Sequence, residues 1–487
     1  MPSLTVGNIS TFLHSMRLGG FNLLGSKQAP INRLPNNVLA EIFLYTIVPQ
    51  DSHSVPVFDE KFMSSTPVIS GYNQNTPFPL SQVCRRWRSI IHNTKAMWKS
   101  IAILNPNKRH VNRTELWLSF ARNHELDIMI LQSESPSEEE IEVTLELLHL
   151  FGKRLQQWAT VEVFFESEAA RLLAAQLVEL RRSPHSIMRS AIIEIQEPMQ
   201  ADLADNMWRS LNRIDSLKEL VWATQQEEIT FTPVHVFGPR IEILHLAVPI
   251  RIDRFLNTVY ASLSLLELRI TLEATATFSI LPVTLPQLET LEVKSTNGLS
   301  AFFDLCTFPS LKSLEIDRIN VSDWPSVLWM LRRSGCQVQV FIVRLPHLPA
   351  HDLVSWIELD VFQALETFVV AGADVTNEVL SALTWPLSIT QPFHKPPSMP
   401  KLRHLGLTHC GPTVDSDVII RMLGSRFWPT LERGIIGQIK KSREELVTAV
   451  LTVHTKTTAM TNYEEMIKNC AERTRDWSDR SLIIRQA

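Results

Sequence analysis

A leucine-based unit that recurs through the second half of the chain constrains the fold most strongly. It reads Leu-x-x-Leu-x-Leu, with other apolar residues at some positions. The unit begins at Leu217, Ile241, Leu263, Leu288, Leu311, Val338, Leu365 and Leu402. Because side chains alternate along a strand, the last two apolar positions of each unit point to one face. A chain of this kind buries its apolar faces by stacking one unit on the next.

The spacing of these units resembles that of leucine-rich repeats, which are typically about 20–29 residues long with a strand and a helix in each. Most starts lie 22–27 residues apart, whereas the step from Leu365 to Leu402 is longer and contains five prolines between residues 386 and 400. These prolines predict a loop insertion. Most units lack the Asn or Cys that regular repeats carry after the strand, so an irregular solenoid is predicted over residues 211–440.

Residues 105–210 are interpreted as degenerate early repeats. An amphipathic helix is predicted over residues 114–122, followed by a strand over 126–130, and a second strand over 158–165. Between these strands, Ser137 and Glu140 have the spacing of a capping box that opens a helix. Residues 441–487, with a similar pair at Ser442 and Glu445, are predicted to be a helical cap at the end of the stack.

A second signal near the N-terminus is split between two short amphipathic helices. The first begins at Leu34-Pro35 and places apolar residues on one face through Phe43, and the second runs from Leu80 to Ile90. Proline suits the first turn of a helix because its missing N–H would be unpaired there. So little sequence surrounds these helices that their apolar stripes are expected to be buried partly against a partner. The alternative is that they are ordinary core helices of a larger domain.

This split pattern resembles the F-box, the helical module through which substrate receptors dock onto the Skp adaptor of cullin–RING ubiquitin ligases. The opening Leu-Pro motif and the later Val-Cys-Arg-Arg-Trp-Arg run, residues 83–88, are both matched in order. Asn37 stands where the family usually has Glu, and a polar segment at 51–77 interrupts the module as a surface insertion. The resemblance implies these adaptor-binding residues: Leu34, Pro35, Val38, Leu39, Ile42, Phe43, Val83, Cys84, Trp87 and Ile90. The module is followed by a Trp and a short predicted strand at 98–101, and this arrangement resembles that of basidiomycete F-box proteins.

The residues that alternate with the buried leucines are predicted to line the concave face of the repeats. In the middle of that face most of them are acidic, so the sequence predicts a groove that binds a target segment carrying Lys or Arg. The alternative is an ordinary solvated surface. The candidate substrate-binding residues are Glu267, Arg269, Glu292, Lys294, Glu315 and Asp317.

Charge, cysteine content and motifs narrow the class of protein. Lys and Arg number 47 against 51 Asp and Glu, so no strong positive field favours a nucleic-acid partner. The five cysteines are widely separated, which indicates neither a zinc site nor a disulfide framework. The sequence contains no run of 18 uncharged apolar residues, so no membrane-spanning segment is predicted. Phosphate-loop, nucleophile-elbow and zinc-protease motifs are missing, so the chain is predicted not to be an enzyme and to need no cofactor or metal.

The combined prediction is an α/β protein with an N-terminal helical F-box followed by an irregular leucine-rich-repeat solenoid. Residues 1–30 are predicted to be a flexible tail, and residues 31–104 the F-box. The resemblance implies a substrate-recognition subunit of an SCF-type ligase in the cytoplasm or the nucleus, partnered by the Skp adaptor, a cullin, a RING subunit and an unidentified target protein. An interaction scaffold without a role in ubiquitination, or an enzyme with its site on the solenoid loops, are the alternatives.

Overall fold

The computed structural model describes residues 30–47, 76–183, 186–196, 200–224, 240–274, 281–295, 298–385, 398–410, 414–427, 448–453 and 481–486. Almost all of the predicted tail and of the predicted insertion therefore lies outside the described residues. The N-terminal part is a helical module of α2 (Asn36–Ile47), α3 (Pro77–Ser81) and α4 (Arg85–Asn93). Two 3-10 turns, η1 (Pro30–Arg33) and η3 (Lys95–Trp98), flank these helices.

One parallel sheet of 14 strands runs through the rest of the described fold. Its strands follow chain order, and each forms backbone hydrogen bonds with the next. They are β1 (Ser100–Leu104), β2 (Leu126–Leu131), β3 (Trp158–Phe165), β4 (Ser190–Ile195), β5 (Glu219–Thr224), β6 (Ile243–Arg251), β7 (Glu267–Glu273), β9 (Thr290–Ser295), β11 (Ser313–Asp317), β12 (Val340–Leu348), β13 (Thr367–Ala373), β14 (His404–Cys410), β15 (Thr448–Val453) and β16 (Ser481–Gln486). The short strands β8 (Val283–Thr284) and β10 (Cys306–Thr307) pair separately.

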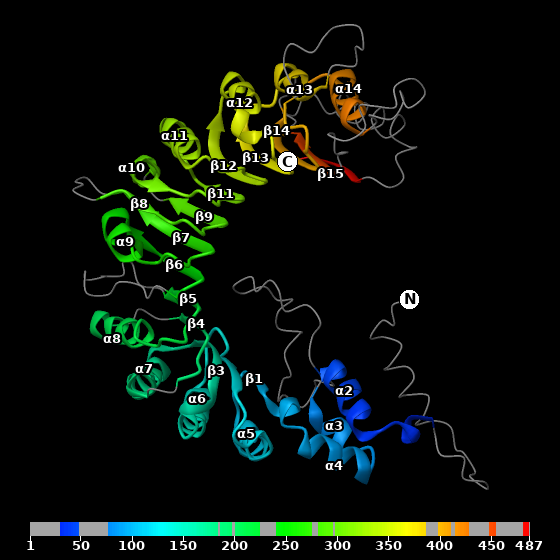
Figure 1. Ribbon diagram of the computed structural model, residues 1–487, viewed down its shortest axis with the longest axis vertical. Helices are drawn as coiled ribbons and strands as arrows, with labels where there is room; N and C mark the ends of the chain where they lie inside the picture. Colours follow the sequence, from blue (N-terminus) through cyan, green and yellow to red (C-terminus); the bar gives the residue numbers. More distant parts are fainter. Residues whose placement is uncertain are drawn as a thin grey trace.

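Helices connect most successive strands and lie on one side of the sheet. In Figure 1 the strands follow one another along an arc, with the helices along its outer side and the helical module at one end. The connecting helices are α5 (Lys108–Ala121), α6 (Glu138–Gly152), α7 (Ser167–Arg182), α8 (Ala201–Leu211), α9 (Ile252–Val259), α10 (Ser300–Leu305), α11 (Trp324–Ser334), α12 (Ala350–Ile357), α13 (Asn377–Leu383) and α14 (Ser416–Phe427). Over the part of the chain that is described, no helix has the length and apolar character needed to cross a bilayer.

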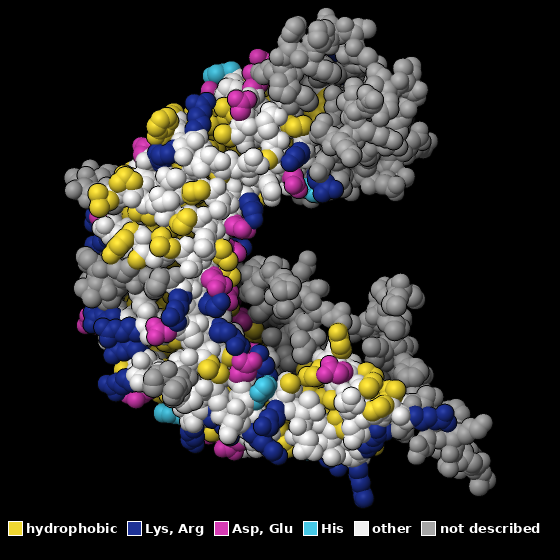
Figure 2. Space-filling model, in the orientation of Figure 1, with side chains coloured by type: hydrophobic (Ala, Val, Ile, Leu, Met, Phe, Trp, Pro, Cys, Tyr) yellow, Lys and Arg dark blue, Asp and Glu magenta, His cyan; other side chains and the backbone are white. Residues whose placement is uncertain are grey.

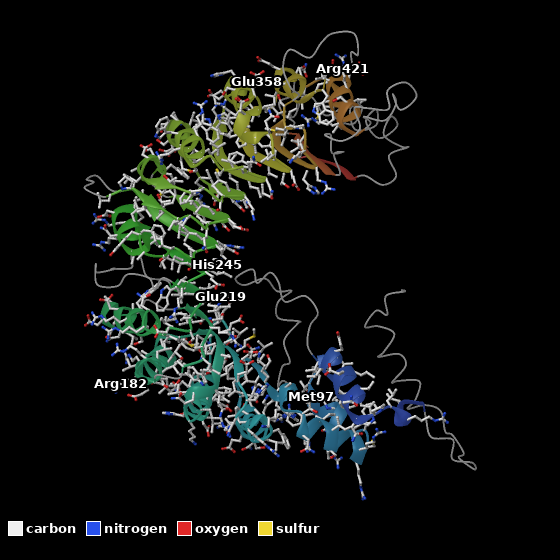
Figure 3. All side chains as sticks on the ribbon, viewed as in Figure 1. Met97, Arg182, Glu219, His245, Glu358 and Arg421 are labelled. Atoms are coloured by element: carbon white, nitrogen blue, oxygen red, sulfur yellow. The ribbon has the colours of Figure 1, made fainter. Side chains whose placement is uncertain are left out.

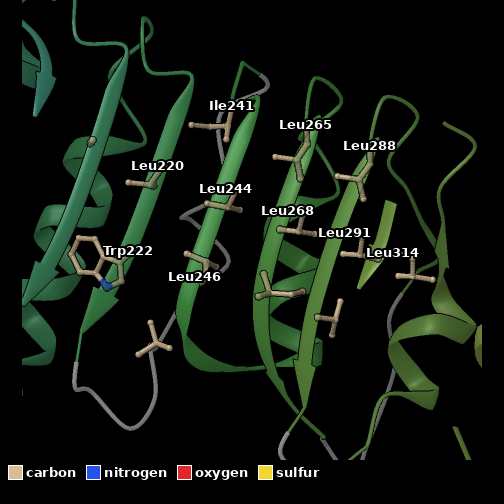
Figure 4. Packing of buried hydrophobic residues seen from close by; sticks show 14 of the residues in the cluster. Leu220, Trp222, Ile241, Leu244, Leu246, Leu265, Leu268, Leu288, Leu291 and Leu314 are labelled. Carbon is tan, nitrogen blue, oxygen red and sulfur yellow. The ribbon is translucent and has the colours of Figure 1, made fainter. Parts of the chain in front are cut away.

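The core lies between the sheet and the outer helices and is built from aligned leucines. Leu220, Leu244, Leu268, Leu291 and Leu314 occupy the same register position on five successive strands. All five side chains are fully buried, and Figure 4 shows them in a row across the sheet. Burying a leucine side chain contributes about 1.5–3 kcal/mol, so this repeated position supplies much of the stability of the stack.

The predicted unit at Leu263 is displaced by two residues in the structure. The buried positions there are Leu265, Leu268 and Ile270, whereas Leu263 and Leu266 are exposed. Four leucines between 263 and 268 allow two registers, and only the packing of the neighbouring units selects one. The shift is an even number of residues, so Glu267 still points to the face that was predicted for it.

The strands predicted within residues 105–210 lie in the same sheet as the later units. β2 and β3 cover the two predicted strands, and β3 has the predicted bounds. Ser137 caps α6 by accepting a hydrogen bond from the Glu140 N–H at 3.2 Å. The predicted reciprocal half of the capping box is wrong, because the Glu140 carboxylate instead accepts from the N–H and the hydroxyl of Ser133, each at 2.8 Å.

The described part of residues 441–487 forms strands rather than the predicted helical cap. β15 and β16 extend the sheet in parallel register, with Thr448 opposite His404 on one side and Ser481 on the other. β15 is rich in β-branched residues, which favour strands. The Ser442 and Glu445 pair lies outside the described residues.

Candidate functional site

Four of the predicted adaptor-binding residues form the core of the helical module itself. Leu39, Phe43, Trp87 and Ile90 are buried. The rings of Phe43 and Trp87 lie 4.6 Å apart between their centroids, which joins α2 to α4. These side chains therefore hold the two helices together. That they also contact the adaptor stays a prediction.

The other predicted residues are accessible. Val38 and Ile42 are each 38% exposed and Val83 is 55% exposed, while Pro35 and Cys84 are also exposed and Leu34 is half-buried. Figure 2 shows hydrophobic side chains gathered over part of the helical module. Large contiguous apolar patches on a protein surface are typical of sites that bind a partner. We call Pro35, Val38, Ile42, Val83 and Cys84 the apolar patch.

Tyr45 belongs to the same helix face and was missed from the sequence. It is 67% exposed, and it follows Val38 and Ile42 at the i, i+4, i+7 spacing that places residues on one side of a helix. That spacing was the signal that would have identified it.

Arg86 fixes the relative position of the two halves of the patch. Its guanidinium donates to the Asn36 side-chain oxygen at 3.0 and 2.8 Å and to the Leu34 carbonyl. The start of α4 is therefore held beside the start of α2, across an interval of about 50 residues in sequence. The Arg86 side chain thus joins the two helices. Arg88 likewise donates to the Ser81 carbonyl at 3.1 Å.

A cluster of aromatic rings joins the helical module to the sheet. Trp98, at the end of η3, lies 5.1 Å from Trp117 and 4.6 Å from Phe120 of α5, measured between ring centroids. Phe78 of α3 contacts both tryptophans edge-on. The Trp117 indole N–H donates to the Trp98 carbonyl at 2.8 Å. We call Phe78, Trp98, Trp117 and Phe120 the aromatic joint.

Comparison with known protein families agrees with this architecture. The F-box-like family model matches residues 31–104, which span the helical module and β1. The chain therefore carries an F-box-like domain, the class of module that in general binds an Skp adaptor. No curated protein matches the chain.

The six predicted substrate-binding residues lie on the inner face of the sheet. Arg269, Glu292 and Glu315 occupy one register row across β7, β9 and β11, and Lys294 and Asp317 are paired in the next row. The structure thus brings together all six residues on three adjacent strands. Figure 2 shows side chains of both charges along the inner side of the arc.

Most of the predicted acidic groove is neutralised within the chain. Arg269 contacts Glu267 at 2.9 Å and Glu292 at 3.6 Å, and Lys294 contacts Glu292 at 3.6 Å. Arg344 of β12 donates to Glu315 at 2.6 Å. The hydrogen bond from His245 and the charge of Arg269 hold the pKa of Glu267 below its usual value. These three glutamates therefore already have cationic partners.

Carboxyl groups with raised pKa values lie on β3 and β4, which hold none of the candidate residues predicted from the sequence. Removal from water, and secondarily the nearby charge of Glu219, raise the pKa of Glu162 to about 8. Removal from water also raises the pKa of Glu194 to about 7. The sequence signal for both glutamates is an acidic residue between valines or isoleucines within a strand. Within the described residues, no group of three or more His, Cys, Asp or Glu side chains is arranged to hold a metal ion.

The raised pKa of Glu162 makes stability depend on pH. Above pH 4.5 the unfolded chain ionises this group while the folded chain keeps it protonated up to about pH 8, so folding is progressively disfavoured over that interval. Glu162→Gln should therefore become more stable than the wild type as the pH rises. We expect a gain on the order of 2–4 kcal/mol at pH 8, since one pKa unit corresponds to about 1.4 kcal/mol and the group retains some solvent contact.

Urea denaturation of both proteins at pH 4.5, 6, 7 and 8 measures this difference. A constant difference across the series would contradict the assigned burial of Glu162. Glu292→Gln is the matched control, because the Glu292 carboxylate has cationic partners on the same face.

Proposed function

We propose that the protein is the substrate-recognition subunit of an SCF-type cullin–RING ubiquitin ligase. In this proposal the apolar patch docks the Skp adaptor, which links the chain to the cullin and RING subunits, and the sheet binds a target protein. One observation carries the proposal. The F-box-like module buries Leu39, Phe43 and Trp87 in its own core, yet it leaves the side chains of the apolar patch exposed. The protein itself performs no chemistry, and it acts in the cytoplasm or the nucleus.

We further propose that the strand–helix units are leucine-rich repeats of the type joined to F-boxes in basidiomycete fungi. Parallel strands in chain order, a helix between most of them and a buried leucine at a fixed register position support this assignment. An extended inner face of this kind presents a long surface to a partner. A scaffold that binds proteins without delivering them for ubiquitination is the second candidate.

Reconstitution separates these two functions. The full chain is co-expressed with an Skp adaptor, a cullin and a RING subunit, and proteins bound to it are identified by mass spectrometry and then tested for ubiquitination by the purified complex. Deleting residues 31–104 is an unsuitable control, because it would remove Trp98 and Phe78 from the aromatic joint. Point variants of the exposed patch avoid this problem. Adaptor binding without ubiquitination of any bound protein would favour the scaffold.

Changing Glu292 and Glu315 together to Lys should reduce target capture while adaptor binding is retained. Each change places a new cation beside existing ones, namely Arg269 and Lys294 for Glu292, and Arg344 for Glu315. Repulsion between like charges at an interface disfavours a basic target, so we expect about a tenfold loss of capture. Quantitative mass spectrometry of co-purified proteins measures it. Unchanged captured proteins would place target recognition on another surface.

A further inference from the structure

Four successive connections from a helix to a strand lie side by side along one edge of the sheet. They join α5 to β2, α6 to β3, α7 to β4 and α8 to β5. Each connection leads into the start of a strand, and the starts of parallel strands lie at the same edge of a sheet. The four strands are neighbours in the sheet, so the four connections follow one another in chain order along that edge.

Hydrogen bonds join each of these connections to the next. The Arg154 guanidinium, after α6, donates to the carbonyl of Arg122 at the end of α5. The Ser183 hydroxyl, after α7, donates to the Gln156 side-chain oxygen at 2.8 Å. The Ser216 hydroxyl, after α8, donates to a backbone carbonyl of the connection between α7 and β4 at 2.7 Å. The edge is therefore one continuous surface rather than four separate loops.

Each of the four helix ends presents a cation whose side chain has no ion-pair or hydrogen-bond partner among the described residues. We call these four residues, which are exposed or half-buried, the basic edge: Arg122, Lys153, Arg181 and Arg213. Figure 2 shows Lys and Arg side chains gathered on the outer side of the arc near α7 and α8. Figure 3 shows Arg182, the last residue of α7, on that outer side, whereas Glu219 and His245 lie on the inner side.

Nearby carboxylates do not neutralise the basic edge. The acidic residues of the four connections are Glu125 and Asp215. Glu125 is occupied by two other cations, Lys99 and Arg189, each at 2.8 Å. Asp215 is a single exposed carboxylate. A surplus of positive charge therefore remains along the edge.

The helix dipole alone does not account for this surplus. Cations are favoured near helix C-termini, so a basic residue at one helix end is expected without any binding role. Other units of the same sheet do not follow this pattern, however. The connection between α9 and β7 has no charged residue, and the one between α12 and β13 carries Glu358, Asp360 and Glu366. The positive charge is thus specific to the four connections from α5 to β5.

We propose that the basic edge binds an acidic segment of a partner polypeptide. This site is separate from the apolar patch and from the inner face, and it does not depend on the proposed function. Four strands about 4.8 Å apart span about 14 Å, and four helices about 10 Å apart span about 30 Å. An extended segment rises about 3.3 Å per residue, so roughly four to nine residues reach all four cations.

A short acidic polypeptide fits this edge better than a nucleic acid. The whole chain has 51 acidic against 47 basic residues. At the opposite edge, where the helices begin, α6, α7 and α8 carry Glu138, Glu168 and Asp202 in their first turns. A long polyanion extends past the basic edge toward such carboxylates and is repelled, whereas a short segment contacts the edge alone.

Fluorescence anisotropy on the full chain tests the proposal with labelled octaglutamate, octaserine and an eight-nucleotide oligothymidylate as probes. At about 20 mM salt octaglutamate should bind at least about tenfold more tightly than either of the others, and its binding should weaken at about 150 mM salt as the charges are screened. Changing Arg181 and Arg213 to Gln should weaken octaglutamate binding about tenfold, because two ionic contacts are lost.

The matched control is the Arg332→Gln, Lys401→Gln variant. It removes two exposed cations from the same edge of the sheet in later units, so the change in net charge is identical. This variant should bind octaglutamate as the wild type does. The Arg122→Gln, Lys153→Gln variant removes the other two cations of the basic edge and should weaken binding to a similar extent. Circular dichroism of each variant establishes that it is folded.

Four results would overturn the proposal. The first is no octaglutamate binding at low salt, and the second is unchanged binding by both variants of the basic edge. The third is an equal loss in the control variant, which would assign the effect to net charge rather than to this edge. The fourth is tighter binding of oligothymidylate than of octaglutamate, which would make the partner a nucleic acid.

Discussion

A variant with Ile42→Asp and Val83→Asp should bind the Skp adaptor at least about 100-fold more weakly than the wild type. Both side chains are exposed parts of the apolar patch, so the module should fold without them. Central apolar anchors of an interface typically cost about 2 kcal/mol or more when removed, and each 1.4 kcal/mol is about tenfold in affinity. Burying two carboxylates against an apolar partner adds a desolvation cost. Surface plasmon resonance with immobilised adaptor measures the change.

The matched control is Ser89→Asp, which introduces a carboxylate at an exposed position of α4 outside the apolar patch. It should leave the affinity unchanged. If the patch variant binds as well as the wild type, the module is not docked through this face. If Ser89→Asp weakens binding equally, the effect comes from added negative charge rather than from lost apolar contact.

Trp98→Ala should destabilise the region around the aromatic joint by about 3–5 kcal/mol, the usual cost of removing a buried aromatic side chain. Trp98 is fully buried, and its indole N–H also donates to the Ile91 carbonyl at 2.9 Å, so the change removes both packing and a hydrogen bond. Amide hydrogen exchange of α4 and α5 should accelerate by at least about 100-fold, because local opening there becomes easier.

Trp329→Ala is the control for this change, because Trp329 is an exposed tryptophan of α11. Surface substitutions usually alter stability by less than about 0.5 kcal/mol, so exchange in α4 and α5 should be unaffected. Slow exchange in the Trp98 variant would mean that the helical module and the first strand–helix unit are stable independently of the joint.

The repeated strands were predictable because their signal is local and periodic. The unit beginning at Leu288, for example, gives β9 with Leu291 buried. The pairings on the inner face were not predictable, because the Arg344–Glu315 contact depends on the register between β11 and β12. A linear sequence shows a surplus of acidic positions, and only the register shows which of them are neutralised.

The adaptor-binding residues illustrate the same limit. Family resemblance named the apolar positions of both helices as one group, but it could not separate Leu39, which is buried, from Ile42, which is exposed. That separation depends on how α2 packs against α4, which is fixed by Phe43, Trp87 and the Arg86 hydrogen bonds. Glu162 and Glu194 were not named as candidates, because a single glutamate in a strand resembles an ordinary surface position although it alternates with buried residues.

Alternation along each strand has a consequence for how such a chain can diverge. Leu291 and Val293 face the core, while Glu292 and Lys294 between them face inward on the arc. A substitution in the second set leaves the buried contacts of the first set intact, so a duplicated copy could acquire a different binding preference one residue at a time. Positions that must be kept for stability and positions that are free to change therefore alternate residue by residue along each strand.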